Sequence, residues 1–158
     1  MAKRTPLKIA KDSAWGAFSS FIRTRDCLRT SGTLEEGVCI SCKRPVPYKG
    51  SQAGHFIAGR TNAILLDEDL VHLQCYHCNI GLSGNYVEYF VAMEQLYTRE
   101  EIDLFRLRKA ATKKMKIDDW KEQTAYWKLR REELERMFTS EGRWSPSLQR
   151  LLELKKTL

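Results

Sequence analysis

The chain has 158 residues, a formal net charge of +7 and a sequence pI near 9.2, and this length suits one compact domain with helical extensions. A hydrophobic fraction of 42% excludes a wholly disordered chain, and no apolar run is long enough to cross a membrane. The charge is uneven: +5 over residues 1–33, −3 over 34–98 and +5 over 99–158. Two basic flanks around an acidic centre favour a polyanionic partner, although solvated helix faces would give the same totals.

The N-terminal segment, residues 1–33, predicts a basic arm followed by a helix. The arm lacks the apolar stretch of a secretory signal, so we expect a cytosolic protein. Asp12 and Ser13 can cap a helix that runs to about Arg29, where "TSGTLEEG" breaks it. The residues that recur at helical spacing are Ala14, Phe18, Phe21, Ile22 and Arg25.

The central segment, residues 34–98, predicts turns and short strands around two cysteine pairs. Prolines and glycines between residues 38 and 66 exclude a long helix there. One helix should begin within "CYHCNIGL", and another should follow Asn85.

The C-terminal segment, residues 99–158, predicts helices. Thr98 and Glu101 have the spacing of a capping box, and Asp118 should cap a long helix that reaches about Phe138. A last helix should start at "SP", residues 145–146. The buried stripe of the long helix should comprise Trp120, Trp127, Leu134 and Phe138. The fold class is therefore α+β and mostly helical, with N-terminal and C-terminal helices around a small zinc-stabilised core.

The cysteine pairs are the strongest signal in the sequence. Cys39-x2-Cys42 and Cys75-x2-Cys78 can each form a turn that presents two thiolates to one ion, and together they predict a tetrahedral structural zinc site. Cytosolic thiols stay reduced, which favours metal over disulfides. The fifth cysteine, Cys27, stands alone within a helix and should be a core residue. The pairs are 32 residues apart, more than a simple zinc ribbon needs, so further structure is built between them.

A histidine lies between the pairs, in "QAGHFIAGRTN". A strand that carries His55, a loop and a helix at the second pair give the ββα-metal arrangement of nucleases. His55 would be the general base that activates water, and Asn79 would offer an oxygen to a catalytic Mg²⁺ or Mn²⁺. Arg60 would clamp the phosphate. The alternatives are a hydrogen-bonded structural histidine, a helix-capping asparagine and a plain surface charge.

The order and spacing of these motifs resemble one family. "CISC", "AGH", "VHLQC", "CN" and "SGN" closely resemble the NinG (Rap) family of lambdoid-phage recombination proteins. The resemblance covers roughly Trp15 to Asp103, from "AFSSFIRTRD" through "YVEYFVAMEQLYTREEID", and extends weakly into "DDWKEQTAYWKLRREEL". The motifs are specific together, although each alone would be weak.

The resemblance implies a divalent-metal-dependent DNA endonuclease that cuts branched recombination intermediates such as Holliday junctions and D-loops. It also implies a four-cysteine zinc site within an HNH-like (His-Me finger), treble-clef-like core. Such a protein would act in the cytoplasm of the phage-infected bacterial host, beside phage or host recombination proteins. The residues expected to contact DNA are Arg60, Lys43, Arg44, Lys113, Lys114 and Lys116.

Two positions depart from HNH enzymes. Family members and many HNH enzymes carry an asparagine five residues before the third cysteine, where this chain has Leu70; Asn62 or Asp69 could substitute for it. Many HNH enzymes also place a metal-binding Asp directly before the base, where this chain and the family have a glycine, Gly54. His72 is the first candidate for the missing ligand, and buried packing is its alternative. The next candidates are Asp67, Glu68 and His77.

The rival functions are non-catalytic. A zinc-dependent accessory protein that binds branched DNA without cutting it is the main alternative, and Leu70 favours it. A zinc adaptor for protein partners is a third possibility, and it would show no salt-dependent DNA affinity. Cutting two opposed strands of a junction needs two active sites, so we expect a homodimer. The apolar residues expected at its interface are Leu148, Leu151, Leu152 and Leu158, unless they pack on their own domain.

Overall fold

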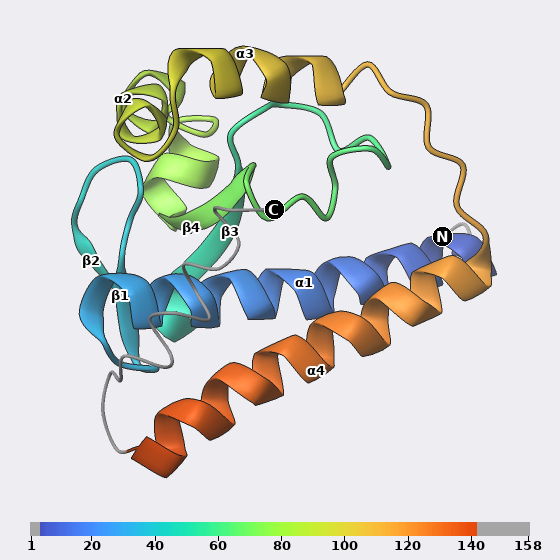
Figure 1. The fold of residues 1–158 in the computed structure, drawn as a ribbon, viewed down its shortest axis with the longest axis horizontal. Helices are drawn as coiled ribbons and strands as arrows, with labels where there is room; N and C mark the ends of the chain where they lie inside the picture. The colour runs from blue at the N-terminus through green and yellow to red at the C-terminus, as the bar shows by residue number, and fades with distance from the viewer. Residues whose placement is uncertain (1–3, 142–158) are drawn as a thin grey trace.

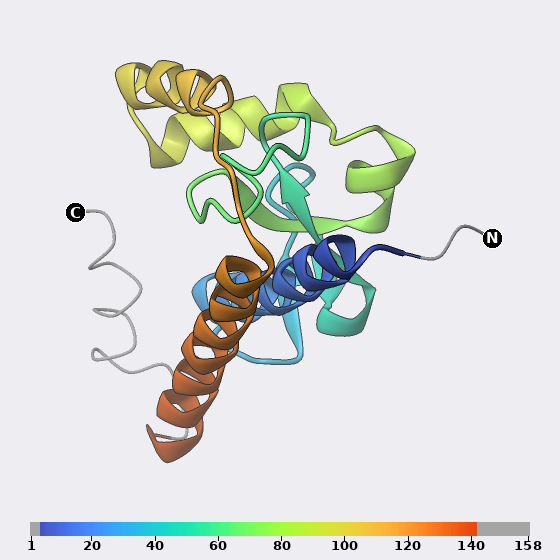
Figure 2. The same cartoon turned by 90° about the vertical axis from the view of Figure 1, so that its right-hand side faces the viewer.

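The computed structural model describes residues 4–141. Two long helices, α1 and α4, lie side by side, and the β3–β4 hairpin separates them from α2 and α3 (Figures 1 and 2). The fold is α+β and mostly helical, as predicted. The elements are α1 (Pro6–Ser31), β1 (Glu36–Val38), β2 (Pro45–Pro47), η1 (Tyr48–Gly50), β3 (Ser51–His55), β4 (Val71–Cys75), η2 (His77–Gly81), α2 (Tyr86–Leu96), α3 (Arg99–Arg108) and α4 (Ile117–Glu141).

Helix α1 begins earlier than the sequence analysis predicted. The Thr5 hydroxyl accepts a hydrogen bond from the Lys8 amide at 3.3 Å, and Pro6 stands at the first helical position. Asp12 and Ser13 are therefore interior helix residues, and their prediction as caps is wrong. The apolar stripe also extends toward the N-terminus, because Ala10 is buried in a cluster with Trp120 of α4 and with Leu65. The helix ends at Gly32, whose φ of 71° permits the left-handed closing turn.

The residue that caps the start of α4 also differs from the prediction, by one position. The Asp119 carboxylate, rather than that of Asp118, accepts a hydrogen bond from the Lys116 amide at 2.7 Å. The predicted stripe is confirmed for Trp120, Trp127 and Leu134, which are buried, whereas Phe138 packs against the same cluster as Trp127 but is only partly buried.

The hairpin register fixes which residues share a face. Strands β3 and β4 are antiparallel, with His55 opposite Val71 and Gly54 opposite His72. Because side chains alternate along a strand, His55 and Val71 lie on one face and His72 lies on the other. The first face packs on α1, through the cluster that includes Phe18 and Val71.

A buried ion pair holds β4 against α1. The Asp26 carboxylate accepts hydrogen bonds from the Leu73 amide at 2.8 Å and from Arg25 at 2.7 Å. Arg25 in turn donates to the carbonyl oxygens of Glu68 and Val71, both at 2.9 Å. The adjacent Arg25 and Asp26 thus dock the loop before β4 and the strand itself onto the helix.

The second layer is formed by α2 and α3. The predicted capping box is present, with the Thr98 and Glu101 side chains each bonded to the other's backbone amide. Helix α2 follows Asn85 as expected. The helix predicted within "CYHCNIGL" is a five-residue π-helical segment, η2. A π-helical turn is rare and is often found at functional sites.

All three predicted segments contribute to one core. Phe18, Ala53 and Trp127 belong to a single buried cluster, and the division at residues 33 and 98 stays a prediction. The predicted last helix and the leucines at 148, 151, 152 and 158 lie outside the described residues. Among the helices described here, none has the length and apolarity that a membrane span requires.

Candidate metal centre and catalytic cleft

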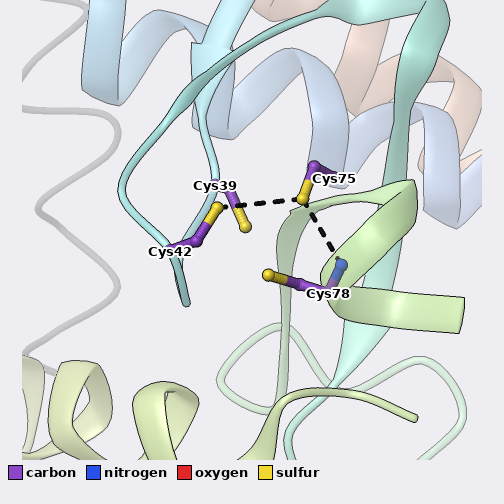
Figure 3. Close-up of side chains that lie close together, drawn as sticks. All are labelled: Cys39, Cys42, Cys75 and Cys78. Atoms are coloured by element: carbon purple, nitrogen blue, oxygen red, sulfur yellow. Dashed lines mark hydrogen bonds between the residues drawn. The ribbon is translucent and has the colours of Figure 1, made fainter. Parts of the chain in front are cut away.

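The two cysteine pairs converge on one point (Figure 3). The sulfur atoms of Cys39, Cys42, Cys75 and Cys78 all lie within 4.8 Å of one another. The Cys42 and Cys75 sulfurs are 3.8 Å apart, which matches the edge of a tetrahedron with Zn–S bonds of about 2.3 Å. The four cysteines could therefore bind a metal ion such as zinc.

Local backbone structure presents these thiols. After β1, the Lys43 amide donates to the Cys39 carbonyl at 3.0 Å, and Lys43 adopts a positive φ of 58°, which closes the first turn. The Cys78 amide donates to the Cys75 sulfur at 3.4 Å and forms the second turn at the end of β4. Cys27 lies apart in the core, and burial raises its pKa to about 12, so it stays a neutral thiol.

A cleft of about 460 Å³ runs along β3, between α1 and η2. It contains the three residues predicted to act on DNA, His55, Asn79 and Arg60. The other lining residues are Trp15, Ser19 and Arg23 of α1, Ser51, Gln52 and Ala53 of β3, Ala58, and Ile80, Ser83 and Gly84 near the second cysteine pair.

His55 is held in one tautomer. Its Nε2 lies 3.2 Å from the Leu65 carbonyl oxygen, and a carbonyl only accepts, so Nε2 carries the hydrogen. Nδ1 therefore keeps a lone pair, and it has no hydrogen-bond partner among the described residues. Burial, together with the charge of Arg60, lowers the pKa of His55 to about 4, although the Leu65 contact opposes the shift. The ring is neutral at pH 7 and can accept a proton.

Trp15 links the base to the predicted phosphate clamp. Its ring stacks on His55, with centroids 4.9 Å apart and 21° between the planes. The Arg60 guanidinium lies 4.5 Å from the Trp15 ring centroid, a cation–π distance. Arg60 is otherwise exposed at the cleft, so it can pair with a phosphate.

Asn79 lies across β3 from these groups. Its Nδ2 donates to the Gln52 Oε1 at 2.6 Å, which leaves the Asn79 Oδ1 directed toward Gly54. This oxygen is a hard ligand suited to Mg²⁺ or Mn²⁺.

The other proposed metal ligands lie elsewhere. His72 is buried on the hairpin face that it shares with Gly54 and Gln74, and its Nδ1 is 3.0 Å from the Tyr89 hydroxyl, which donates to the Gly54 carbonyl. Burial lowers the pKa of His72 to about 3, against the opposing effect of Asp26. None of the remaining candidates lines the cleft: Asp67 is paired with Arg108, Glu68 with Arg130, and His77 is exposed.

The loop behind His55 is stabilised without an asparagine at position 70. Leu70 is fully buried in a core cluster. Arg108 instead binds the carboxylates of Asp67 and Asp69, each at 2.9 Å. Asn62 accepts a hydrogen bond from Lys11 at 2.7 Å and donates to a backbone carbonyl before α4. Asn62 and Asp69 therefore both anchor the loop.

Apart from Arg60, the predicted DNA-contacting lysines and arginines lie outside the cleft. Lys43 and Arg44 are exposed at the first cysteine turn, and the three lysines between α3 and α4, Lys113, Lys114 and Lys116, are exposed as well. The α1 wall of the cleft was not predicted from the sequence. Trp15, Ser19 and Arg23 recur at intervals of four, and this spacing was the available signal.

One comparison with known proteins gives a match. A family model described as "Bacteriophage Lambda NinG protein" covers residues 2–137. The chain belongs to the NinG family. This family is related to phage recombination, and the match extends through α1 and most of α4, beyond the region in which the motifs lie. No curated protein and no solved structure matches the chain.

Proposed function

We propose that the chain is a structure-selective DNA endonuclease that hydrolyses phosphodiester bonds in branched recombination intermediates, such as Holliday junctions and D-loops. The observation that carries the proposal is the neutral His55, whose Nε2–H faces the Leu65 carbonyl while Nδ1 keeps its lone pair beside a cleft. A lone pair on a neutral imidazole is what a general base needs. Family membership supports the recombination setting, in the infected bacterial host.

The chain's residues would divide the work of hydrolysis. Nδ1 of His55 accepts a proton from the water that attacks phosphorus. The guanidinium of Arg60 pairs with a non-bridging phosphate oxygen and draws the backbone to the cleft mouth. The bond to the 3′ oxygen breaks, this oxygen takes a proton from solvent, and the products carry 5′-phosphate and 3′-hydroxyl ends.

A divalent cation fits this site chemically. Asn79 would hold a Mg²⁺ or Mn²⁺ through Oδ1, and the ion would stabilise charge on the phosphate and on the departing oxygen. The four cysteines would hold a separate, structural zinc.

Branched DNA would be bound by more than the cleft. Arg23 also lines the cleft, eight residues along α1 from Trp15, and its guanidinium is 4.5 Å from the Tyr48 ring centroid. The exposed lysines and arginines around the first cysteine turn and between α3 and α4 add phosphate contacts that read no sequence. A homodimer would bring two clefts to opposed strands.

The test is cleavage of a synthetic four-way junction beside a linear duplex of the same sequence, in Mg²⁺, Mn²⁺ or EDTA. We expect the parent to cut the junction only with a divalent ion, and His55→Ala to lose roughly 10²–10⁴ in rate while it still binds the junction. Gln95→Ala, an exposed change on α2, is the control and should cut normally. Unimpaired cutting by His55→Ala would remove the assignment of the base.

If the purified parent binds the junction but never cuts it, the accessory, non-catalytic function is the correct one. In that case binding should survive in EDTA for as long as the zinc stays bound, and it should fall steeply as salt rises.

A further inference from the structure

The side chain of Gln74, on β4, ends in an unsatisfied oxygen. Gln74 is fully buried. Its Nε2 donates to the Ser41 hydroxyl at 2.7 Å and to the Gly84 carbonyl at 2.8 Å. Exchanging the amide oxygen and nitrogen would place two acceptors together at Gly84, so the orientation is fixed. Within the part of the chain that the structure describes, Oε1 is the one buried side-chain nitrogen or oxygen without a hydrogen-bond partner.

This oxygen points to the place where a side chain is missing. A Cβ atom built on Gly54 would lie 1.9 Å from the Gln74 Oε1 and 3.1 Å from the Asn79 Oδ1. Gly54 does not have a left-handed φ, so its backbone does not require glycine. The absence of a side chain at this position leaves space in which two amide oxygens converge.

Both amides are held by hydrogen bonds that their nitrogens donate to neighbouring groups. Gln74 is fixed through its Nε2, and Asn79 donates its Nδ2 to Gln52 at 2.6 Å. Each amide therefore uses its nitrogen for structure and turns its oxygen toward Gly54. Buried polar atoms normally find a partner, because an unpaired one costs stability. A bound cation would supply the missing partner.

We propose that Gln74 Oε1 and Asn79 Oδ1 together form a divalent-cation site, in which Gln74 takes the place of the carboxylate that Gly54 cannot provide. The site itself rests on the geometry at Gly54, and the assignment of its ion to phosphodiester hydrolysis rests on the proposed function. We assign Gln74 rather than His72 as the second ligand, because the Gln74 Oε1 lies beside the missing Gly54 side chain together with the Asn79 Oδ1.

Because both ligands are neutral, the affinity of the site for the ion should depend on bound DNA. Mg²⁺ and Mn²⁺ are usually held by carboxylates together with substrate phosphates, and this pair of amides brings no negative charge. The ion should therefore bind weakly to the free protein and much more tightly once a phosphate enters the cleft.

The experiment counts bound Mn²⁺ by electron paramagnetic resonance in zinc-loaded protein mixed with a four-way junction. A His55→Ala background keeps the DNA intact. We expect Gln74→Ala to weaken Mn²⁺ binding roughly tenfold or more and Gln74→Glu to strengthen it by a similar factor. Ser41→Ala is the matched control, because it removes one bond to the Gln74 nitrogen and leaves the oxygen in place. It should bind Mn²⁺ like the parent.

A double variant tests the geometry directly. Gln74→Ala frees the space beside Gly54, so Gly54→Asp combined with it should restore Mn²⁺ binding through a carboxylate at position 54. Unchanged Mn²⁺ binding in a Gln74→Ala protein that retains one zinc per chain would overturn the proposal. If Gln74→Ala loses its zinc, Gln74→Glu decides instead, and an unchanged affinity there would overturn the proposal.

The two proposals fail in different ways. If the parent cuts the junction but substitutions of Gln74 do not change Mn²⁺ affinity, the ion site is refuted and the nuclease proposal stands. If substitutions of Gln74 change Mn²⁺ affinity as expected but the parent never cuts a junction, the ion site is supported and the nuclease proposal is refuted.

Discussion

The indole of Trp15 stacks on the imidazole of His55, and the same indole carries the guanidinium of Arg60 on its ring. A residue of the N-terminal helix thus sets the position of two groups that β3 and the following loop bring to the cleft. Trp15 touches no reacting atom in the proposed mechanism, so it is a positioning residue.

Removing this stack should slow cleavage without abolishing it. We expect Trp15→Leu to lower kcat for junction cleavage roughly ten- to hundredfold, because small misplacements of a catalytic group are costly. Trp15→Phe keeps an aromatic face and should retain most of the rate. A purely structural role would instead show as a loss of zinc or of helical circular dichroism in Trp15→Leu. Equal rates in Trp15→Leu and the parent would show that the stack does not position the base.

The pH dependence of cleavage should report the lowered pKa of His55. Burial lowers this pKa to about 4, so the ring keeps its lone pair well below pH 6.5. We expect kcat/KM, measured at fixed Mn²⁺, to stay high at pH 6 and to fall only as pH approaches 4. Zinc content must be measured at every pH, and rates are compared only at pH values where the protein retains one zinc per chain.

Arg60 gives an internal check on that profile. Its positive charge contributes to the lowered pKa of His55, so Arg60→Gln should raise the pKa and move the acid limb to higher pH. An acid limb at pH 6.5 in the parent, unmoved by Arg60→Gln, would mean that another group limits the rate.

Loss of the buried carboxylate of Asp26 should destabilise the whole fold. Asp26→Ala leaves Arg25 buried without its counter-ion and the Leu73 amide without its acceptor. Breaking a buried pair in this way costs about 3–5 kcal/mol, which urea unfolding of the zinc-loaded protein would measure. Asp118→Ala removes a carboxylate that is 85% exposed and should change the midpoint little. Similar midpoints for both variants would show that the ion pair does not hold β4.

The cysteines should fall into two groups when each is replaced. A serine at position 39, 42, 75 or 78 should lower zinc affinity and unfold the region around β4 and η2, since structural zinc supplies on the order of ten kcal/mol. Cys27→Ala should still bind one zinc per chain, because Cys27 lies outside the cluster. Zinc content by atomic absorption, with thermal melts before and after chelation, distinguishes the groups. Equal zinc loss in Cys27→Ala would contradict the four-cysteine site.

The parts of the fold that local sequence dictates were predictable. The capping box at Thr98, the break at Gly32 and the spacing of Trp120 and Trp127 each follow from residues close together in the chain. The four-cysteine cluster was also predictable, because metal-ligand spacing is itself a local pattern.

The composition of the cleft depends on contacts distant in sequence. Trp15 and His55 are 40 positions apart, and only the packing of α1 on the hairpin brings them together. Apolar and polar residues alternate in "VHLQC", as in a strand with one exposed face, yet Val71 to Gln74 are all buried. Only the folded hairpin shows that the Gln74 Oε1 lies beside Gly54.

The cluster that unites Phe18, Ala53 and Trp127 restricts how this protein can be dissected or diversified. A fragment of residues 34–98 would keep every cysteine ligand but would expose one hairpin face to water and lose the α1 wall of the cleft. An exchange of either flank for that of another protein would have to preserve this packing. New substrate preferences are therefore easier to reach by substitutions on exposed helix faces than by exchange of modules.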